Sequence, residues 1–185
     1  EILLKLIDIP EDLQIDDLFA PVLGHLLGTI ADDRVPVVEG LTVELAEDQL
    51  KAICAGGASS GAVHLFHIVG QTPEALTLAE AFQGHEPTEV HDINLRDLRH
   101  IRSELDSSQG KALDMVVLGS PHFSFAEFRK LEPMIEGQQC HTDVDFLVTS
   151  SRAMVKLARE SGLLDTLEAF GGKVTVDTCI LTTPM

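Results

Sequence analysis

Short apolar runs alternate along the chain with longer stretches in which apolar residues recur every three or four positions. The runs predict strands near residues 36–39, 62–69, 114–118, 145–149 and 173–177, with a shorter candidate at 90–93. The longer stretches predict helices over residues 16–30, 46–55, 73–82, 95–105, 124–135 and from 153 to 167. Runs that are apolar on both faces and alternate with helices are typical of βαβ units. The pattern therefore predicts an α/β fold with one mostly parallel sheet and helices on both faces.

The expected ends of these helices rest on short local signals. The pair Gly56-Gly57 is expected to stop the helix that begins near residue 46, and residues 57–61 are expected to form a turn of small residues. Asn94 is the expected cap of the helix that follows it, and residues 124–127 read Ser-Phe-Ala-Glu, which is a capping box.

Length, charge and cysteine content limit the kinds of protein that this chain can belong to. With 185 residues, of which 44% are hydrophobic, residues 1–185 are expected to form a single α/β domain, with 106–110 as its one soft connection. Thirteen Lys and Arg against 30 Asp and Glu give a net charge of −17, which disfavours nucleic acids and anionic membranes as partners. No apolar run reaches the roughly 20 residues of a membrane span, and no signal peptide is recognisable, so a cytoplasmic location is expected. Three distant cysteines form no disulfide framework, which fits a reducing compartment.

In open parallel sheets, ligands bind where loops leave the carboxyl ends of strands and helices begin. Loops in such positions carry hydroxyl, imidazole, guanidinium or thiol groups at residues 70–74, 119–124, 149–152 and 177–184. We expect them to form one pocket for a small polar acid, at one edge of the sheet. The candidate pocket residues are His67, Thr72, His122, Ser124, Ser150, Ser151, Arg152 and Cys179.

Each of these groups also has an ordinary structural interpretation. From spacing alone, Ser124 is explained better as a helix cap, beside a surface His122, because capping boxes are common. Arg152 suits the binding of a carboxylate, but a cation at the start of a helix opposes the helix dipole, which leaves a solvated residue as the alternative. A lone cysteine such as Cys179 is commonly a small buried apolar residue. His64 and His67 stand three apart in an expected strand and so point to opposite faces, which excludes a shared ligand site.

Three motifs carry a likeness to a known family. They are Gly57-Ala-Ser-Ser-Gly-Ala-Val-His-Leu-Phe-His-Ile-Val-Gly-Gln-Thr-Pro-Glu-Ala75, Gly119-Ser-Pro-His-Phe-Ser-Phe-Ala-Glu-Phe128 and Asp177-Thr-Cys179. Together, and in this order, they resemble the catalytic domain of the aconitase X family over nearly the whole chain. The resemblance implies a dehydratase, a hydro-lyase that acts on a small hydroxy acid. Bacterial members similar to this chain act on cis-3-hydroxy-L-proline, and archaeal members on mevalonate 5-phosphate.

The same resemblance implies roles and partners. His122 and Ser124 would be catalytic, and the substrate would be bound by His67, Thr72, Ser150, Ser151 and Arg152. Catalytic chains of the family are much longer and often have a small swivelling domain, either fused or as a separate subunit. Because this chain starts without Met and stops directly after an expected strand, it is expected to be the central or C-terminal part of such a region, and inactive in isolation.

An iron-sulfur cluster or iron is the implied cofactor. In the wider aconitase superfamily a Gly-Ser-Cys turn and a Cys-x-x-Cys pair hold the cluster. The corresponding positions here read Gly119-Ser120-Pro121 and Cys179 to Thr182, so that Cys179 is the one remaining thiolate and other ligands would lie outside this chain. Cys54, on the apolar face of its expected helix, and Cys140, in a loop at the amino end of the sheet, are expected to be structural. The rival interpretation is a non-catalytic ligand-binding or interaction domain with the same fold.

Overall fold

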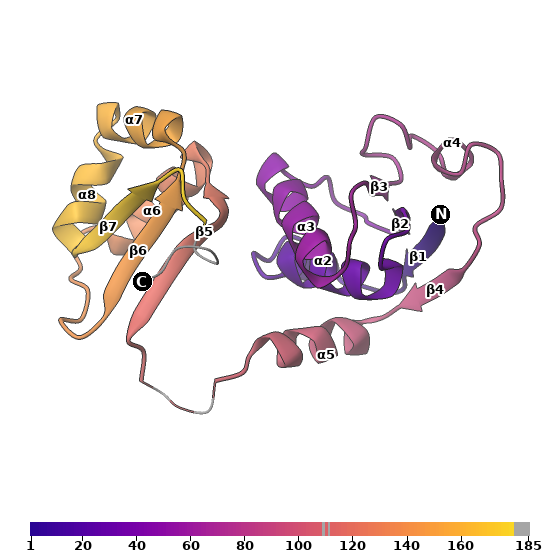
Figure 1. Ribbon diagram of the computed structural model, residues 1–185, viewed down its shortest axis with the longest axis horizontal. Coiled ribbons are helices and arrows are strands. Elements are labelled where there is room, and N and C mark those ends of the chain that lie inside the picture. The colour runs from indigo at the N-terminus through magenta and orange to yellow at the C-terminus, as the bar shows by residue number, and fades with distance from the viewer. Residues whose placement is uncertain (109, 111, 180–185) are drawn as a thin grey trace. The chain divides into compact units, whose positions relative to one another are not determined.

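The computed structural model describes residues 1–108, 110 and 112–179. It divides into two compact units, Glu1–Ser107 (unit 1) and Ser108–Met185 (unit 2), and each unit has its own parallel sheet (Figure 1). The predicted α/β class with parallel strands is confirmed. The expectation of one sheet in one domain is wrong, since the described strands of unit 1 pair only with one another, as do those of unit 2. Apolar runs indicate parallel strands but not which strands pair. The division falls at the connection predicted over residues 106–110.

The sheet of unit 1 has the strand order β3-β2-β1-β4 and is parallel throughout. Its strands are β1 (Ile2–Leu6), β2 (Pro36–Glu39), β3 (His67–Ile68) and β4 (Val90–Ile93). The sequence predicted no strand at the position of β1, yet β1 is central, and Leu4 pairs with both Val38 and His91. Because β1 has neighbours on both sides, its apolar residues are almost fully buried.

Helices cover both faces of this sheet, as predicted. They are α1 (Glu11–Gln14), α2 (Phe19–Ala31), α3 (Glu47–Ser60), α4 (Leu78–Ala81) and α5 (Leu95–Leu105). Leu4 and Val38 face the larger core, to which α2, α3 and α5 contribute their apolar residues. Leu3 and Val37 face the opposite way, into a smaller core that includes Ala81 of α4.

The glycines after residue 55 do not end a helix, which corrects the expected stop and turn. Instead α3 continues to Ser60 and packs closely against α2. A Cβ atom on Gly28 would lie 2.5 Å from the carbonyl oxygen of Gly57, and one on Gly24 would lie 2.6 Å from that of Ile53. Cβ atoms do not approach other atoms so closely, so these positions require glycine. The glycine-rich sequence therefore reflects helix–helix contact rather than a turn.

Two other predicted elements are shorter than expected. The predicted strand over residues 62–69 is reduced to β3, because an edge strand beside the short β2 pairs only through Val37 and Val38. The predicted helix over 73–82 is reduced to α4, which begins only after the capping box of Thr77 and Glu80. Residues 70–75 form a turn instead, closed by a hydrogen bond from the Gly70 N–H to the Ala75 carbonyl.

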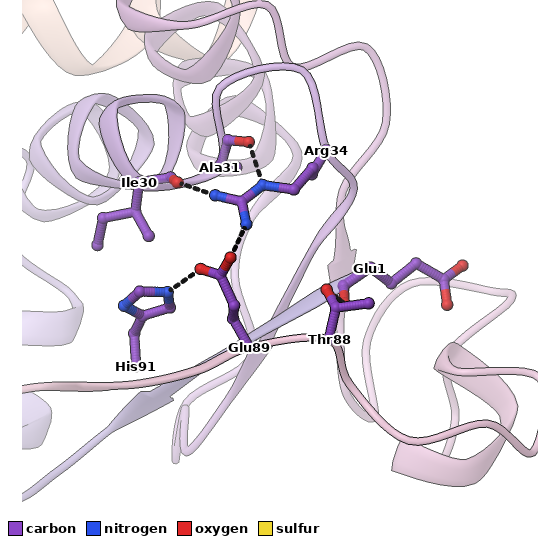
Figure 2. A network of polar contacts seen from close by, with 7 residues as sticks. All are labelled: Glu1, Ile30, Ala31, Arg34, Thr88, Glu89 and His91. Atoms are coloured by element: carbon purple, nitrogen blue, oxygen red, sulfur yellow. Dashed lines mark hydrogen bonds and ion pairs between the residues drawn. The ribbon is translucent and has the colours of Figure 1, made fainter.

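A polar network fastens the end of α2 to the start of β4 (Figure 2). Arg34 donates from Nε to the Ala31 carbonyl at 3.0 Å and from Nη2 to the Ile30 carbonyl at 2.8 Å. Its Nη1 also donates to Glu89, whose second oxygen lies 3.1 Å from Nε2 of His91. The hydrogen bond with His91, and then that with Arg34, lower the pKa of Glu89 below its usual value.

Unit 2 is a three-stranded parallel sheet in the order β5-β6-β7. Its elements are β5 (Met115–Phe123), α6 (Phe125–Ile135), β6 (Asp145–Ser150), α7 (Arg152–Glu160), α8 (Leu163–Phe170) and β7 (Gly172–Val176). All three helices share one core with Val148 of β6. The predicted helix over 153–167 is two helices, because Gly162 lies between them in the left-handed conformation, with φ of 79°. The predicted caps are confirmed: Asn94 accepts a hydrogen bond from the Arg96 N–H, and Ser124 from the Glu127 N–H.

Candidate functional site

The loops that follow β5, β6 and β7 begin at the same edge of the unit 2 sheet, because the three strands are parallel and adjacent. The pairing of β5 with β6 is irregular between Leu118 and Phe123, where the chain leaves the regular ladder. Gly119 lies in that irregular stretch with φ of 99°, and a Cβ there would be 2.0 Å from the Thr149 carbonyl oxygen. The hydroxyl of Thr149 in turn donates to the Gly119 carbonyl at 2.6 Å. The irregular part of β5 is thus fixed tightly against the end of β6.

Three predicted site serines use their hydroxyls within the fold. Ser124 caps α6, where its hydroxyl accepts from the Glu127 N–H at 3.1 Å and its own N–H donates to the Glu127 carboxylate at 2.7 Å. Ser150 is completely buried and donates to the Phe123 carbonyl at 2.6 Å. Ser151 caps α7. Full burial excludes direct contact between Ser150 and a bound acid, which corrects its expected role.

Arg152 is exposed at the start of α7, and Asp177 directly follows β7. Asp177 accepts a hydrogen bond from the backbone N–H of Arg152 at 3.1 Å, and its second oxygen accepts one from Nε of the same residue. The backbone hydrogen bond, and then the guanidinium, hold the pKa of Asp177 below its usual range. A carboxylate at this helix terminus offsets the unfavourable position of a cation there. The two residues thus link the loop after β6 to the loop after β7.

His122 lies near the carboxyl end of β5, and Cys179 follows β7, at the same edge of the sheet. His122 is exposed, and its Nε2 lies 2.8 Å from the carbonyl oxygen of Thr178. Because a carbonyl only accepts, Nε2 carries the proton in this hydrogen bond, and in a neutral ring the lone pair is on Nδ1. Cys179 is exposed and comes directly after Thr178. Arg152 and Cys179 follow neighbouring parallel strands as predicted, whereas His122 lies within β5, close to its carboxyl end.

His67 and Thr72 belong to unit 1, so the prediction that all the candidates share one sheet edge is wrong. Thr72 closes its own turn, since its hydroxyl accepts from the Ile68 N–H at 3.0 Å. His67 is only 7% exposed, and its Nδ1 has no hydrogen-bond partner in the described part of the chain. An open groove of about 470 Å³ lies beside the ends of β2 and β3, but its lining residues do not include His67 or Thr72.

The described residues do not form a complete metal site. Among them, no group of three or more His, Cys, Asp or Glu side chains is arranged to hold an ion. Cys140 lies in the loop before β6, at the amino end of the strand as predicted, and its thiol faces the Val144 carbonyl at 3.5 Å. Cys54 is exposed on α3, which corrects its expected place on the apolar face. Thr182, which occupies the second position of the implied Cys-x-x-Cys pair, lies outside the described residues. Cys179 alone does not fit a cluster held by three thiolates.

Asp177 is a functional candidate that the sequence did not single out. Its residue type and its place before Thr178 and Cys179 were visible, but its partner Arg152 is 25 residues away along the chain. No local spacing rule connects residues so far apart, whereas the pairing of β6 with β7 brings them together.

Within the described residues, no helix is long and apolar enough to cross a bilayer.

Comparison with known proteins identifies similar sequences over most of the chain. Residues 4–103 match the family model described as "Aconitase X second domain", and residues 113–185 match "Aconitase X third domain". The cis-3-hydroxy-L-proline dehydratases of Pseudomonas aeruginosa and Hypocrea jecorina are 42% and 41% identical, over 91% and 89% of this chain. The phosphomevalonate dehydratase large subunit of Methanothermobacter thermautotrophicus is 34% identical over 88%.

The chain spans only part of each of these proteins, namely 30%, 28% and 39% of their respective lengths. A solved structure, the holo-form of aconitase X from Thermococcus kodakaraensis, superposes with a TM-score of 0.82 over 99% of this chain and 45% of that one. Its sequence identity is 23%, so this likeness concerns the fold alone.

Proposed function

Because the chain belongs to the aconitase X family, we propose that the protein that carries it is a hydro-lyase that removes water from cis-3-hydroxy-L-proline. The observation that supports this substrate most strongly is the 42% and 41% identity to two cis-3-hydroxy-L-proline dehydratases, against 34% for a phosphomevalonate dehydratase large subunit. Mevalonate 5-phosphate is the alternative substrate. Dehydration of either acid removes a hydroxyl group and a proton from neighbouring carbons.

Within unit 2, the exposed groups of the sheet edge suit the binding of such an acid. The terminal nitrogens of Arg152 would bind the substrate carboxylate, since a guanidinium pairs with a carboxylate through two parallel hydrogen bonds. His122 would exchange a proton through its exposed imidazole ring, which a hydrogen bond with the Thr178 carbonyl holds in place. Ser124 and Ser151 would support the site indirectly, by fixing the starts of α6 and α7.

The proposed cofactor is iron or an iron-sulfur cluster, to which Cys179 would contribute one thiolate. Since the described residues do not complete a ligand set, the other ligands would come from parts of the enzyme outside these 185 residues. The relatives are about three times as long as this chain or somewhat less, which leaves room for such parts. A swivelling domain or small subunit would be a further part, as the name "large subunit" implies for the archaeal relatives.

A substrate comparison tests this proposal. The protein that carries the chain is purified without oxygen and incubated separately with cis-3-hydroxy-L-proline and with mevalonate 5-phosphate, and mass spectrometry follows the loss of water. Dehydration of the hydroxyproline alone is the expected result. Dehydration of mevalonate 5-phosphate alone would assign the other activity of the family. Loss of water from neither acid would favour a non-catalytic binding domain.

A further inference from the structure

Asp177 binds Arg152 without contacting the two terminal nitrogens of the guanidinium. The carboxylate accepts hydrogen bonds from the backbone N–H and from Nε of Arg152. Neither Nη1 nor Nη2 of Arg152 donates a hydrogen bond to a described residue. An arginine has five N–H donors in one plane, four of them on the two terminal nitrogens. Once Nε is held, the plane of these four donors is fixed as well.

Packing does not fix the Arg152 side chain, because 82% of its surface is exposed. A long exposed side chain samples many rotamers unless a specific contact selects one. The contact with Asp177 selects one rotamer of Arg152, since the main chain and the side chain of this arginine bind the same carboxylate. Binding a ligand then costs less ordering, because the arginine is already oriented.

Asp177 is itself held in place by its neighbours. Its N–H donates to the Ser150 carbonyl at 3.0 Å, one residue beyond the regular end of β7. Its φ is +51°, which is uncommon for a residue other than glycine. The next residue, Thr178, is bound through its carbonyl to His122. The hydrogen bond to Ser150 and the hydrogen bond of the next residue hold the backbone of Asp177 in place, and residues held in rare backbone conformations cluster at functional sites.

We propose that Asp177 is a positioning residue that sets the direction of the Arg152 guanidinium, so that its two terminal nitrogens bind the carboxylate of the substrate. This inference rests on the proposed function, since it takes Arg152 to be the residue that binds the substrate. It also explains why an arginine begins α7, where the helix dipole disfavours a cation. Asp177 does not touch the substrate; it acts through Arg152.

The decisive variants are Asp177→Asn and Arg152→Ala, alone and combined, in the iron-loaded protein that carries this chain. Asparagine keeps an acceptor for the Arg152 backbone N–H but loses the charged partner of Nε. The expected result for Asp177→Asn is a KM for cis-3-hydroxy-L-proline raised about tenfold, with kcat changed much less, because carboxylate binding is weakened. Arg152→Ala should raise KM more. In the Arg152→Ala background, Asp177→Asn should have no further effect.

A matched control is Lys173→Gln. It breaks the ion pair between Lys173 and Asp145, which are 2.7 Å apart in β7 and β6, at the ends of these strands far from Asp177. This variant should leave KM and kcat unchanged. Iron per chain is measured for every variant, so that loss of metal is not mistaken for weak binding. An unchanged KM in a fully iron-loaded Asp177→Asn protein would overturn the proposal, and so would additive effects of the two substitutions.

A binding measurement separates this inference from the proposed activity. L-Proline carries the ring and the carboxylate but no hydroxyl group, so calorimetry measures its affinity without dehydration. Affinity about tenfold weaker in Asp177→Asn than in the unmodified protein would support the positioning role, even if no acid is dehydrated. Equal affinity, or no binding of L-proline to the unmodified protein, would overturn it.

Discussion

His67 shows how a single buried residue departs from ordinary packing. The residue is only 7% exposed, yet its Nδ1 has no hydrogen-bond partner among the described residues. A buried polar nitrogen without a hydrogen bond costs about 1–3 kcal/mol. The sequence indicated the position of His67 in a strand but not this missing contact.

Replacement of His67 by leucine tests whether that nitrogen is unsatisfied. We expect His67→Leu to raise the free energy of unfolding by about 1 kcal/mol, because the substitution removes the unpaired polar atom and keeps an apolar side chain. The exposed His64, three residues earlier, provides the matched control, and His64→Leu should change stability by less than about 0.5 kcal/mol. Urea unfolding measures both. A clear loss of stability in His67→Leu would mean that Nδ1 has a partner.

Glu89 gives a prediction of pH dependence. Its pKa in the folded protein lies below the ordinary value of 4.5, mainly through the hydrogen bond with His91 and then that with Arg34. Such a group contributes stability that is present above its unfolded pKa and is lost as the pH falls through the folded pKa. We therefore expect Glu89→Gln to reduce stability near neutral pH, and the difference from the unmodified protein to vanish in acid.

Unfolding by urea at a series of pH values measures this difference. Glu86→Gln is the control, since Glu86 is exposed in the same segment. A Glu89→Gln penalty that stays constant from neutral pH into acid would contradict the assignment of the lowered pKa to Glu89.

At the scale of elements, the contact between α2 and α3 depends on glycine. A Cβ on Gly28 would approach Ser60 Oγ to 2.2 Å and the Gly57 carbonyl oxygen to 2.5 Å. We expect Gly28→Ala to destabilise the protein by about 1–3 kcal/mol, because the helices must separate to admit the methyl group. Gly110→Ala is the control, since a Cβ there meets no atom within 4 Å. Thermal unfolding measures both, and equal midpoints would contradict the close packing.

The elements also show what local sequence reveals. Asn94 and Ser124 were predicted as caps because a cap depends on residues one to three positions away, and both are confirmed. The glycines of α3 were misread, because a glycine that admits a neighbouring helix looks the same in sequence as one that ends a helix. The central strand β1 was missed because its burial comes from β2 and β4, which lie far along the chain.

At the scale of the whole molecule, the two units explain which part of the candidate site was predictable. Arg152 and Cys179 follow adjacent strands of one parallel sheet, and His122 lies near the end of a third, so the simple rule for strand ends placed them at one edge. His67 lies in β3 and Thr72 follows this strand, but β3 belongs to another sheet. The rule applies within a sheet, and the sequence pattern did not show where one sheet ended and the next began.

The chain spans about a third of its relatives, so its isolated behaviour should differ from that of a complete enzyme. We expect the 185 residues alone to fold, because each unit has its own core, but to bind no stoichiometric iron and dehydrate nothing. A single thiolate at the sheet edge is too few ligands for a stable cluster. Elemental analysis measures the iron, and a stoichiometric cluster in the isolated chain would contradict the expectation.

The central claim is that this chain supplies part of a dehydratase site that includes Cys179. The most direct measurement is the rate of water loss from cis-3-hydroxy-L-proline, in the protein that carries the chain, for Cys179→Ala beside Cys54→Ala. Cys54 is an exposed cysteine of unit 1 and serves as the matched control. The account predicts that Cys179→Ala abolishes dehydration while Cys54→Ala retains it. A fully active Cys179→Ala protein would contradict the account.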